Sequence, residues 1–190
     1  MKNSTEFFEA NKTFHLYSRS IGNQNLFLSD GNYIYFLEKY AHYCGDCFET
    51  IAYCLLPNHF HFFVRVKSNQ EDKEIVKSFS NFLNSYAKAF NKAMGRSGSL
   101  FQRKFKRKLV DNDSYLSRII LYIHLNPIKH GLVKKAKDWK YSSFGAYYSD
   151  KPSKISKELG LGWFGGISEF LKIHENSVEE YLPVKYQLDS

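Results

Sequence analysis

The sequence predicts an α+β fold built on a ferredoxin-like (split βαβ) antiparallel sheet with helices on one face. Runs that alternate between apolar and polar residues indicate strands, and longer stretches with apolar residues three or four positions apart indicate amphipathic helices. These segments follow one another in the order β-α-β-β-α-β, which is that of the split βαβ motif. With 190 residues, 43% of them hydrophobic, the chain can bury one substantial core.

The first strand and the first helix are expected over residues 13–20 and 30–43. Residues 13–20 (TFHLYSRS) alternate well enough to form a strand. In the second segment, Asp30 is a suitable N-cap and apolar residues recur after it at helical spacing. The two segments therefore form the first β-α pair of the motif.

Two neighbouring strands are expected over residues 48–56 and 59–67. Both segments are rich in apolar residues, and the first ends at Pro57. The link Pro57-Asn58 is short and made of turn-forming residues, which fits a hairpin. We therefore expect these strands to be antiparallel neighbours.

The second half of the motif consists of a helix over 71–94, a basic strand over 105–110 and a further helix from about Asp113 to Leu125. Apolar residues along the first of these helices are three or four positions apart: Ile75, Phe79, Phe82, Tyr86 and Phe90. The residues at 111–114 (DNDS) are all types that cap helix N-termini.

Two histidines separated by one bulky residue head the strand over 59–67. Because successive side chains of a strand point to opposite faces, His59 and His61 share a face and Phe60 turns into the core. Two such imidazoles can bind a divalent metal ion and leave coordination positions open for a substrate. On these three residues alone, a half-exposed histidine pair without a ligand is the more common arrangement.

Basic residues are concentrated in one part of the chain. The net charge is +8, and residues 75–110 contain no Asp or Glu. Their basic side chains are Lys77, Lys88, Lys92, Arg96, Arg103, Lys104, Lys106, Arg107 and Lys108. A second basic group consists of Lys129, Lys134, Lys135, Lys137 and Lys140. Aromatic residues lie among both groups, as they do where bases stack beside phosphate-binding lysines, so a nucleic-acid-binding face is expected.

The helix that begins near Asp113 carries two polar side chains on one side. At about 100° per residue, its core stripe consists of Leu116, Ile120 and Ile123. Tyr122 projects away from the centre of this stripe, and Asn126 follows four residues later on nearly the same side. The two side chains therefore point to a common place, and Asn126-Pro127 is expected to end the helix there.

Four sequence motifs occur in a specific order and spacing. They are LPNHFH at 56–61, FQRKF at 101–105, YIHLNPIKHGLV at 122–133 and WKYSSF at 139–144. With these motifs the chain resembles the single-tyrosine transposases of the HUH (His-hydrophobe-His) nuclease superfamily, in particular the REP-associated tyrosine transposase branch. The resemblance covers roughly residues 13–148, and it implies the HUH-nuclease form of the ferredoxin-like fold.

The resemblance implies a metal-dependent reaction on DNA. His59 and His61 would bind one Mg²⁺ or Mn²⁺ ion, and Asn126 is the matching position for a third ligand. Tyr122 would attack the phosphorus of single-stranded DNA, giving a 5′-phosphotyrosine link and a free 3′-hydroxyl that can later reverse the step. The partner would be single-stranded or hairpin DNA, bound by a monomer or a homodimer.

Contacts to that DNA are expected from the acid-free segment. The candidates, chosen by density and position, are Lys88, Lys92, Arg96, Arg103, Lys104, Lys106, Arg107 and Lys108. At the metal, His124 and His130 are alternative third ligands, because many relatives use Gln or a carboxylate where this chain has an Asn. Tyr115 shares the Tyr122 side of the helix and is an alternative nucleophile ranked second.

Two other functions fit parts of the sequence. One is a single-stranded DNA- or RNA-binding module that has lost cleavage, and the other is a replication-initiator or relaxase-like nickase. A pure binding module has no chemical need for His59, His61 and Tyr122 together. Initiators and relaxases generally carry further domains, for which 190 residues leave little room. A metal-dependent hydrolase unrelated to DNA is disfavoured by the charge distribution.

The chain is expected to divide into a transposase domain over 1–150 and a C-terminal extension over 151–190. The extension carries five basic and six acidic residues and so lacks the basic bias of the domain. We expect it to pack onto the domain or to contact another protein.

A cytoplasmic protein without membrane contact is expected. No run approaches the roughly 20 apolar residues of a membrane span, and the N-terminus lacks a signal-peptide pattern. Cys44, Cys47 and Cys54 lack the spacing of a zinc site and the context of a redox motif, so we expect reduced thiols without a chemical role.

Overall fold

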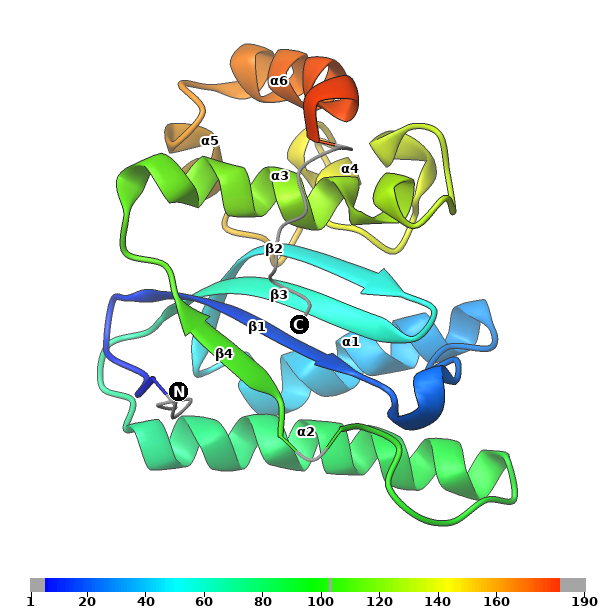
Figure 1. Ribbon diagram of the computed structural model, residues 1–190. Coiled ribbons are helices and arrows are strands. Elements are labelled where there is room, and N and C mark those ends of the chain that lie inside the picture. The colour runs from blue at the N-terminus through cyan, green and yellow to red at the C-terminus, as the bar shows by residue number, and fades with distance from the viewer. Residues whose placement is uncertain (1–5, 103, 182–190) are drawn as a thin grey trace, which may run out of the picture.

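A four-stranded antiparallel sheet forms the centre of the molecule (Figure 1). The computed structural model describes residues 6–102 and 104–181. The strands are β1 (Thr13–Arg19), β2 (Phe48–Leu56), β3 (His59–Val66) and β4 (Lys106–Leu109), in the spatial order β2-β3-β1-β4. This order, with helices between β1 and β2 and between β3 and β4, confirms the ferredoxin-like α+β fold.

Helices α1 (Asp30–Cys44) and α2 (Asp72–Ala93) cover one face of the sheet (Figure 1). The core beneath them is largely aromatic, because Phe60 and Phe62 of β3 meet rings from both helices. Ser29 is the N-cap residue of α1, so the expected cap, Asp30, is the first helical residue instead.

The opposite face is covered by α3 (Asp113–Lys129) (Figure 1). The expected placement of helices on one face therefore holds for α1 and α2 only. The reason lies in β2 and β3, which bury side chains on both faces and need a second apolar cover. Three helices that follow α3 in the chain complete this layer: α4 (Phe144–Tyr147), α5 (Lys157–Gly162) and α6 (Ile167–Tyr181). Two 3₁₀ turns, η1 (Ile21–Asn23) and η2 (Ala136–Asp138), lie in the connections.

Helix α3 runs one turn further than its sequence suggests. Pro127 was expected to end it, yet the helix contains Pro127 and continues to Lys129. The helix ends before Gly131, which has a φ of +67°. Glycine adopts this left-handed conformation readily because it has no Cβ atom. The Leu132 N–H donates to the Pro127 carbonyl and the Gly131 N–H donates to that of Ile128, which is a Schellman ending.

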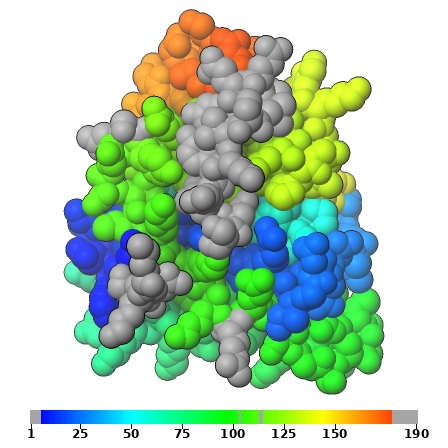
Figure 2. Space-filling view, viewed as in Figure 1, coloured from blue at the N-terminus to red at the C-terminus, as the bar shows by residue number. Residues whose placement is uncertain are grey.

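The segment after residue 150 contributes to the core on the α3 side. Phe164 and Phe170 are buried there, and α6 packs against α3. In the space-filling view, α6 lies at the opposite end of the visible face from α2 (Figure 2). Within the described ranges, no helix combines the length and the hydropathy needed to cross a membrane.

Candidate active site

The two histidines of β3 lie on the face that α3 covers. Their ring centroids are 5.2 Å apart, and Phe60 between them points into the core under α1 and α2, as the alternation predicts. Both imidazoles are buried, with 4% of His59 and 1% of His61 exposed, rather than half-exposed on an open strand. They are therefore groups in an enclosed polar site.

Strand β1 supplies three residues that the sequence analysis missed. In the antiparallel register, Tyr17 lies opposite His61 and Arg19 lies opposite His59. His15 belongs to the same alternating set, and its Nε2 lies 2.9 Å from Nδ1 of His61. The period-two pattern His15-x-Tyr17-x-Arg19 was visible in the sequence, but its meaning depends on β1 pairing with β3.

Tyr122 of α3 stands over this part of the sheet. Its ring centroid is 5.6 Å from that of His61 and 6.1 Å from that of His15, both in edge-to-face orientation. The residue is off the centre of the apolar stripe of α3, as expected, but it faces the sheet and only 5% of it is exposed. Tyr122 and the histidine pair therefore face each other within one chain.

The extra turn of α3 brings two more polar residues to the same place. The Lys129 ammonium lies 5.2 Å from the centre of the Tyr122 ring. The His130 ring centroid is 4.9 Å from that of His59. A helix that ended at Asn126-Pro127 would have directed neither residue here, so both positions follow from the late helix end.

Asn126 is a buried amide on α3, four residues after Tyr122 and so on nearly the same side of the helix. None of its surface is exposed, and neither amide atom has a hydrogen-bond partner among the residues that the structure describes. No three His, Cys, Asp or Glu side chains within 6–102 and 104–181 are placed to hold a metal together. The Asn126 amide oxygen is a suitable third donor beside the two imidazoles.

His124, one of the alternative ligands, faces away from the site. Its Nδ1 lies 3.0 Å from His174 Nε2 on α6, and its Nε2 lies 2.8 Å from the Ser143 hydroxyl. Burial lowers the pKa of His124 well below its ordinary value. This imidazole is a neutral structural group that joins α3 to α6.

Burial also keeps His61 in its metal-binding form. The pKa of His61 lies well below the usual value for an imidazole. The largest cause is burial, which disfavours the charged ring, and the nearby His15 and His59 lower the pKa further. A neutral imidazole has a lone pair for a metal ion, whereas the imidazolium does not. At neutral pH His61 is therefore able to act as a ligand.

A hollow of about 210 Å³ opens beside the histidines. Its lining includes Tyr17, Arg19, Gln102, Lys104 and Lys106 in addition to His59 and His61. The acid-free basic segment thus reaches the histidine pair through the residues just before β4 and the start of that strand. A phosphate group in this hollow would lie among cationic side chains and imidazoles.

Four of the candidate DNA-binding lysines are exposed and well placed. Lys106 and Lys108 lie opposite Tyr17 and His15 in the β1–β4 register, on the histidine side of the sheet. Lys88 and Lys104 line a neighbouring groove of about 720 Å³ between α2 and residues 98–105. Together they extend the basic surface from the histidine site toward α2.

The remaining candidates differ in their surroundings. Arg107 differs from the exposed lysines, because its side chain is 7% exposed, forms an ion pair with Asp72 at 2.7 Å and lies over the Phe8 ring. Lys92 is exposed on α2, and Arg96 donates to the Ser99 carbonyl at 3.4 Å. Arg103 lies outside the described residues. Since the Arg107 charge is already paired with Asp72, the exposed lysines are better placed to contact DNA.

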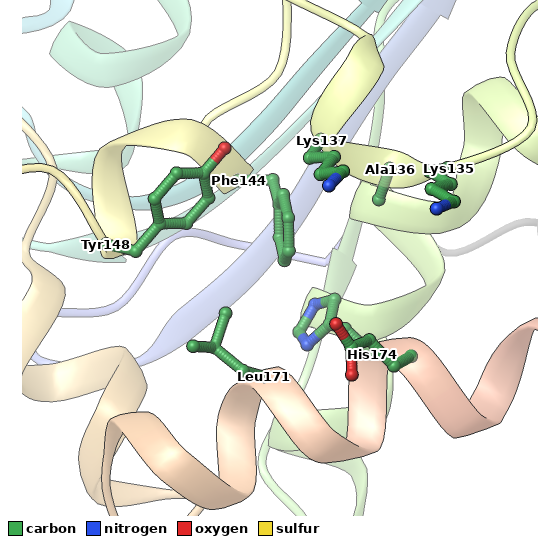
Figure 3. Close-up of a pocket in the computed structure, with 8 residues that line it drawn as sticks. Lys135, Ala136, Lys137, Phe144, Tyr148, Leu171 and His174 are labelled. Atoms are coloured by element: carbon green, nitrogen blue, oxygen red, sulfur yellow. The ribbon is translucent and has the colours of Figure 1, made fainter.

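A second hollow lies on the far side of α3 from Tyr122. It has a volume of about 450 Å³ and lies between η2, α4 and α6. Phe144 and Leu171 give it an apolar lining, Lys135 and Lys137 lie along one side, and His174 lies on the α6 side (Figure 3). Because His174 is the partner of His124, this hollow borders the structural histidine pair and is separate from the Tyr122 site.

The sheet, the two histidines on β3 and the tyrosine that faces them define a protein of the tyrosine transposase class. A family described as "Transposase IS200 like" matches residues 27–126, more than half of the chain. The chain therefore belongs to the IS200-like transposase family.

Individual relatives point to the same branch as the motifs. A REP-associated tyrosine transposase of Escherichia coli (strain K12) is 31% identical over 124 residues, or 65% of this chain and 67% of that protein. A protein of Haemophilus influenzae that carries the same name provisionally is 36% identical over 104 residues, or 51% of this chain and 59% of that protein. This second match thus spans less than two thirds of its relative.

The fold agrees with a solved structure. A REP-associated tyrosine transposase bound to a REP hairpin superimposes with a TM-score of 0.63 at 23% identity. The match covers 80% of this chain and 89% of that one. At this identity the likeness concerns the fold, and it includes most of the molecule described above.

Proposed function

We propose that this protein cuts single-stranded DNA and joins the ends again, with Tyr122 as the nucleophile. The observation that carries this proposal is the position of the Tyr122 ring, 5.6 Å from that of His61 across an enclosed polar site. Both residues come from one chain, so we propose that the site is complete within a monomer.

The chemistry of Tyr122 suits a reversible strand exchange. Its hydroxyl oxygen attacks phosphorus and loses its proton, the bond between phosphorus and the 3′ oxygen breaks, and that oxygen leaves as a 3′-hydroxyl with a proton from solvent. The product is a 5′-phosphotyrosine ester of the same bond type as the one that was cut. A phenolate is a good leaving group, since an ordinary tyrosine has a pKa near 10, so another 3′-hydroxyl can reverse the step without ATP.

A divalent ion, Mg²⁺ or Mn²⁺, would be held by His59, His61 and Asn126. The buried Asn126 amide supports this ligand set, because a buried amide without a hydrogen bond costs free energy and coordination through its oxygen offsets that cost. When bound, such an ion polarises a phosphate oxygen and orients the phosphodiester. The Asn126 amide oxygen suits a hard cation such as Mg²⁺ or Mn²⁺, and the two imidazoles are borderline donors that leave coordination positions open.

Cationic side chains around the hollow would hold the phosphate in position. Arg19 and Lys106 line it together with the histidines, and Lys104 lies at the boundary with the groove beside α2. We propose that these three residues contact the scissile strand and that Lys88 and Lys92 contact the DNA beyond it. Since one relative is bound to a REP hairpin, a hairpin beside a single-stranded cleavage site is the proposed substrate.

A denaturing-gel assay for a covalent protein–DNA adduct tests the nucleophile. Single-stranded and hairpin oligonucleotides from the flanks of the encoding gene are incubated with the protein in Mg²⁺, Mn²⁺ or EDTA. We expect an adduct that needs the metal and is absent in Tyr122→Phe, while gel-shift binding changes little. The matched controls are Tyr115→Phe, on the same helix, and Tyr17→Phe, 5.8 Å from His61.

Mapping the peptide that carries the nucleotide separates the possible outcomes. An adduct on Tyr17 or Tyr115 that persists in Tyr122→Phe would overturn the assignment. Tight, salt-sensitive binding with no adduct on any of the oligonucleotides would favour a binding module without cleavage. Nicking without joining of a second strand would favour a nickase.

A further inference from the structure

Each histidine of the pair has its Nδ1 atom engaged by a neighbouring side chain. His61 Nδ1 lies 2.9 Å from His15 Nε2, and His59 Nδ1 lies 2.6 Å from Asn58 Oδ1. The two contacts come from different elements, since His15 belongs to β1 and Asn58 to the β2–β3 link. The same ring atom is thus occupied in both imidazoles.

The contact to His59 defines where its proton lies. Asn58 donates through its amide nitrogen to Oδ1 of Asn23, which fixes the orientation of the amide and leaves its oxygen toward the ring. An amide oxygen can only accept a hydrogen bond. His59 Nδ1 must therefore carry the hydrogen, and in a neutral ring Nε2 is then the atom with the free lone pair for coordination.

The contact to His61 joins two imidazoles, so the hydrogen lies on one of the two nitrogens. His15 is fully buried and is held rigidly, because β1 pairs with β3 along its whole length and the His15 ring stacks on Tyr17 at 4.7 Å. If His61 donates from Nδ1, its Nε2 has a lone pair for coordination, as in His59. If His15 donates instead, His61 carries its hydrogen on Nε2 and cannot bind an ion through that atom.

We propose that His15 and Asn58 are positioning residues that accept the Nδ1–H of His61 and His59, so that both Nε2 atoms are the metal-binding ones. The proposal rests on the proposed function in taking the histidine pair as ligands. Metal-binding histidines in proteins usually donate their second ring N–H to a fixed acceptor, which sets both the tautomer and the ring orientation. Here an imidazole and an amide would do this for the two ligands.

The tautomers can be measured directly in the metal-free protein. Long-range ¹H–¹⁵N NMR spectra at pH 8, where imidazoles are largely neutral, distinguish an Nδ1–H ring from an Nε2–H ring. We expect the Nδ1–H form for both His59 and His61. An Nε2–H form of either residue in the wild-type protein would overturn its half of the proposal, whatever the variants do.

Two pairs of variants connect the tautomer to metal affinity. Gln at position 15 keeps a polar atom near the place of Nε2, whereas Phe keeps the ring and removes the acceptor. Asp at position 58 keeps the oxygen, whereas Leu keeps the size and removes it. We expect His15→Phe and Asn58→Leu to weaken Mn²⁺ binding, measured by calorimetry, by about 10- to 100-fold. His15→Gln and Asn58→Asp should retain most of the affinity.

The controls separate this inference from the proposed function. Far-UV circular dichroism and thermal midpoints identify a variant that has lost its fold, in which case the wild-type NMR result alone decides. Folded His15→Phe with unchanged Mn²⁺ affinity would contradict the positioning role. The NMR spectra can show Nδ1–H tautomers, and the variants can change Mn²⁺ affinity as expected, in a protein that never forms a DNA adduct. In that case the inference would be supported and the proposed function would fail.

Discussion

The Lys129 side chain places a positive charge beside the Tyr122 ring. Its ammonium lies 5.2 Å from the ring centre, seven residues and two helical turns after the tyrosine. A cation at this place stabilises the negative charge that develops when the phenol loses its proton, and interactions of this kind are stronger in an enclosed site than in water. We therefore expect Lys129 to activate Tyr122 for attack.

Replacing Lys129 should therefore slow cleavage more than it weakens binding. In Lys129→Met we expect the single-turnover rate of adduct formation to fall by at least about tenfold, because the developing charge loses its partner. Lys129→Arg should retain most of the rate. The matched control is Lys134→Met, which removes an exposed lysine of the same basic group. Equal losses of rate in Lys129→Met and Lys134→Met would mean that Lys129 contributes only to general DNA attraction.

The end of α3 determines which residues reach the site. The Schellman ending at Gly131 lets the helix continue past Pro127, and the added turn directs Lys129 and His130 toward Tyr122 and His59. Proline is tolerated here although it lacks an N–H group, since only one helical hydrogen bond is lost. The position of the glycine, rather than that of the proline, sets the length of this element.

Gly131→Ala tests this role of the helix end. The φ of +67° is strained for a residue with a Cβ atom, although no atom lies within 4 Å of the added carbon. We expect the free energy of unfolding to fall by about 1 kcal/mol, measured by urea denaturation. Cleavage should slow as well, because the terminal turn loses its fixed direction.

Gly162→Ala provides the matched control for that substitution. Gly162 lies in α5, its added Cβ would also meet no atom within 4 Å, and its φ is not positive. We expect its stability to stay the same or rise slightly, since alanine favours helix. A Gly131→Ala protein as stable as the Gly162→Ala protein would contradict the role given to the Schellman ending.

At the scale of the whole molecule, the sheet is enclosed by a core on each face. The core under α1 and α2 is largely aromatic, and the core on the other face joins α3 to the C-terminal helices. Between α3 and α6, the polar link is the chain of hydrogen bonds from Ser143 through His124 to His174 and on to the Phe170 carbonyl. We propose that residues 151–181 fold with the rest as one cooperative unit.

Acid should weaken this link and with it the whole fold. Burial lowers the pKa of His174 from 6.5 to about 4, so the unfolded chain takes up a proton on this residue at a higher pH than the folded one does. Its contribution to stability is complete above pH 6.5 and is lost as the pH falls toward 4. We expect a loss on the order of 3 kcal/mol from this residue over that range.

Urea midpoints at pH 7.5 and pH 4.5 measure the effect. The drop between the two should be smaller in His174→Gln than in the wild-type protein, because the variant has one titrating group fewer. His42→Gln, which removes an exposed histidine, should leave the drop unchanged. If all three proteins lose the same amount of stability, the His124–His174 pair does not link stability to pH.

Much of the fold and the centre of the site followed from the sequence alone. Local periodicity located the four strands and helices α1, α2 and α3 to within a few residues, but not the short helices α4 and α5. It also placed His59 with His61 on one face, because the side-chain direction within an element depends only on its own geometry. The same reasoning put Tyr122 off the apolar stripe of α3. These are short-range properties, so no knowledge of other elements was needed.

Only the tertiary structure decided what surrounds these residues. His15, Tyr17 and Arg19 joined the site through the pairing of β1 with β3, a register that depends on contacts far apart in the chain. In the same way, the ion pair of Arg107 with Asp72 joins residues 35 positions apart and could not be foreseen from either segment alone. Which face each helix covers is likewise set by the apolar area that the sheet leaves open, a property of the assembled sheet rather than of any one segment.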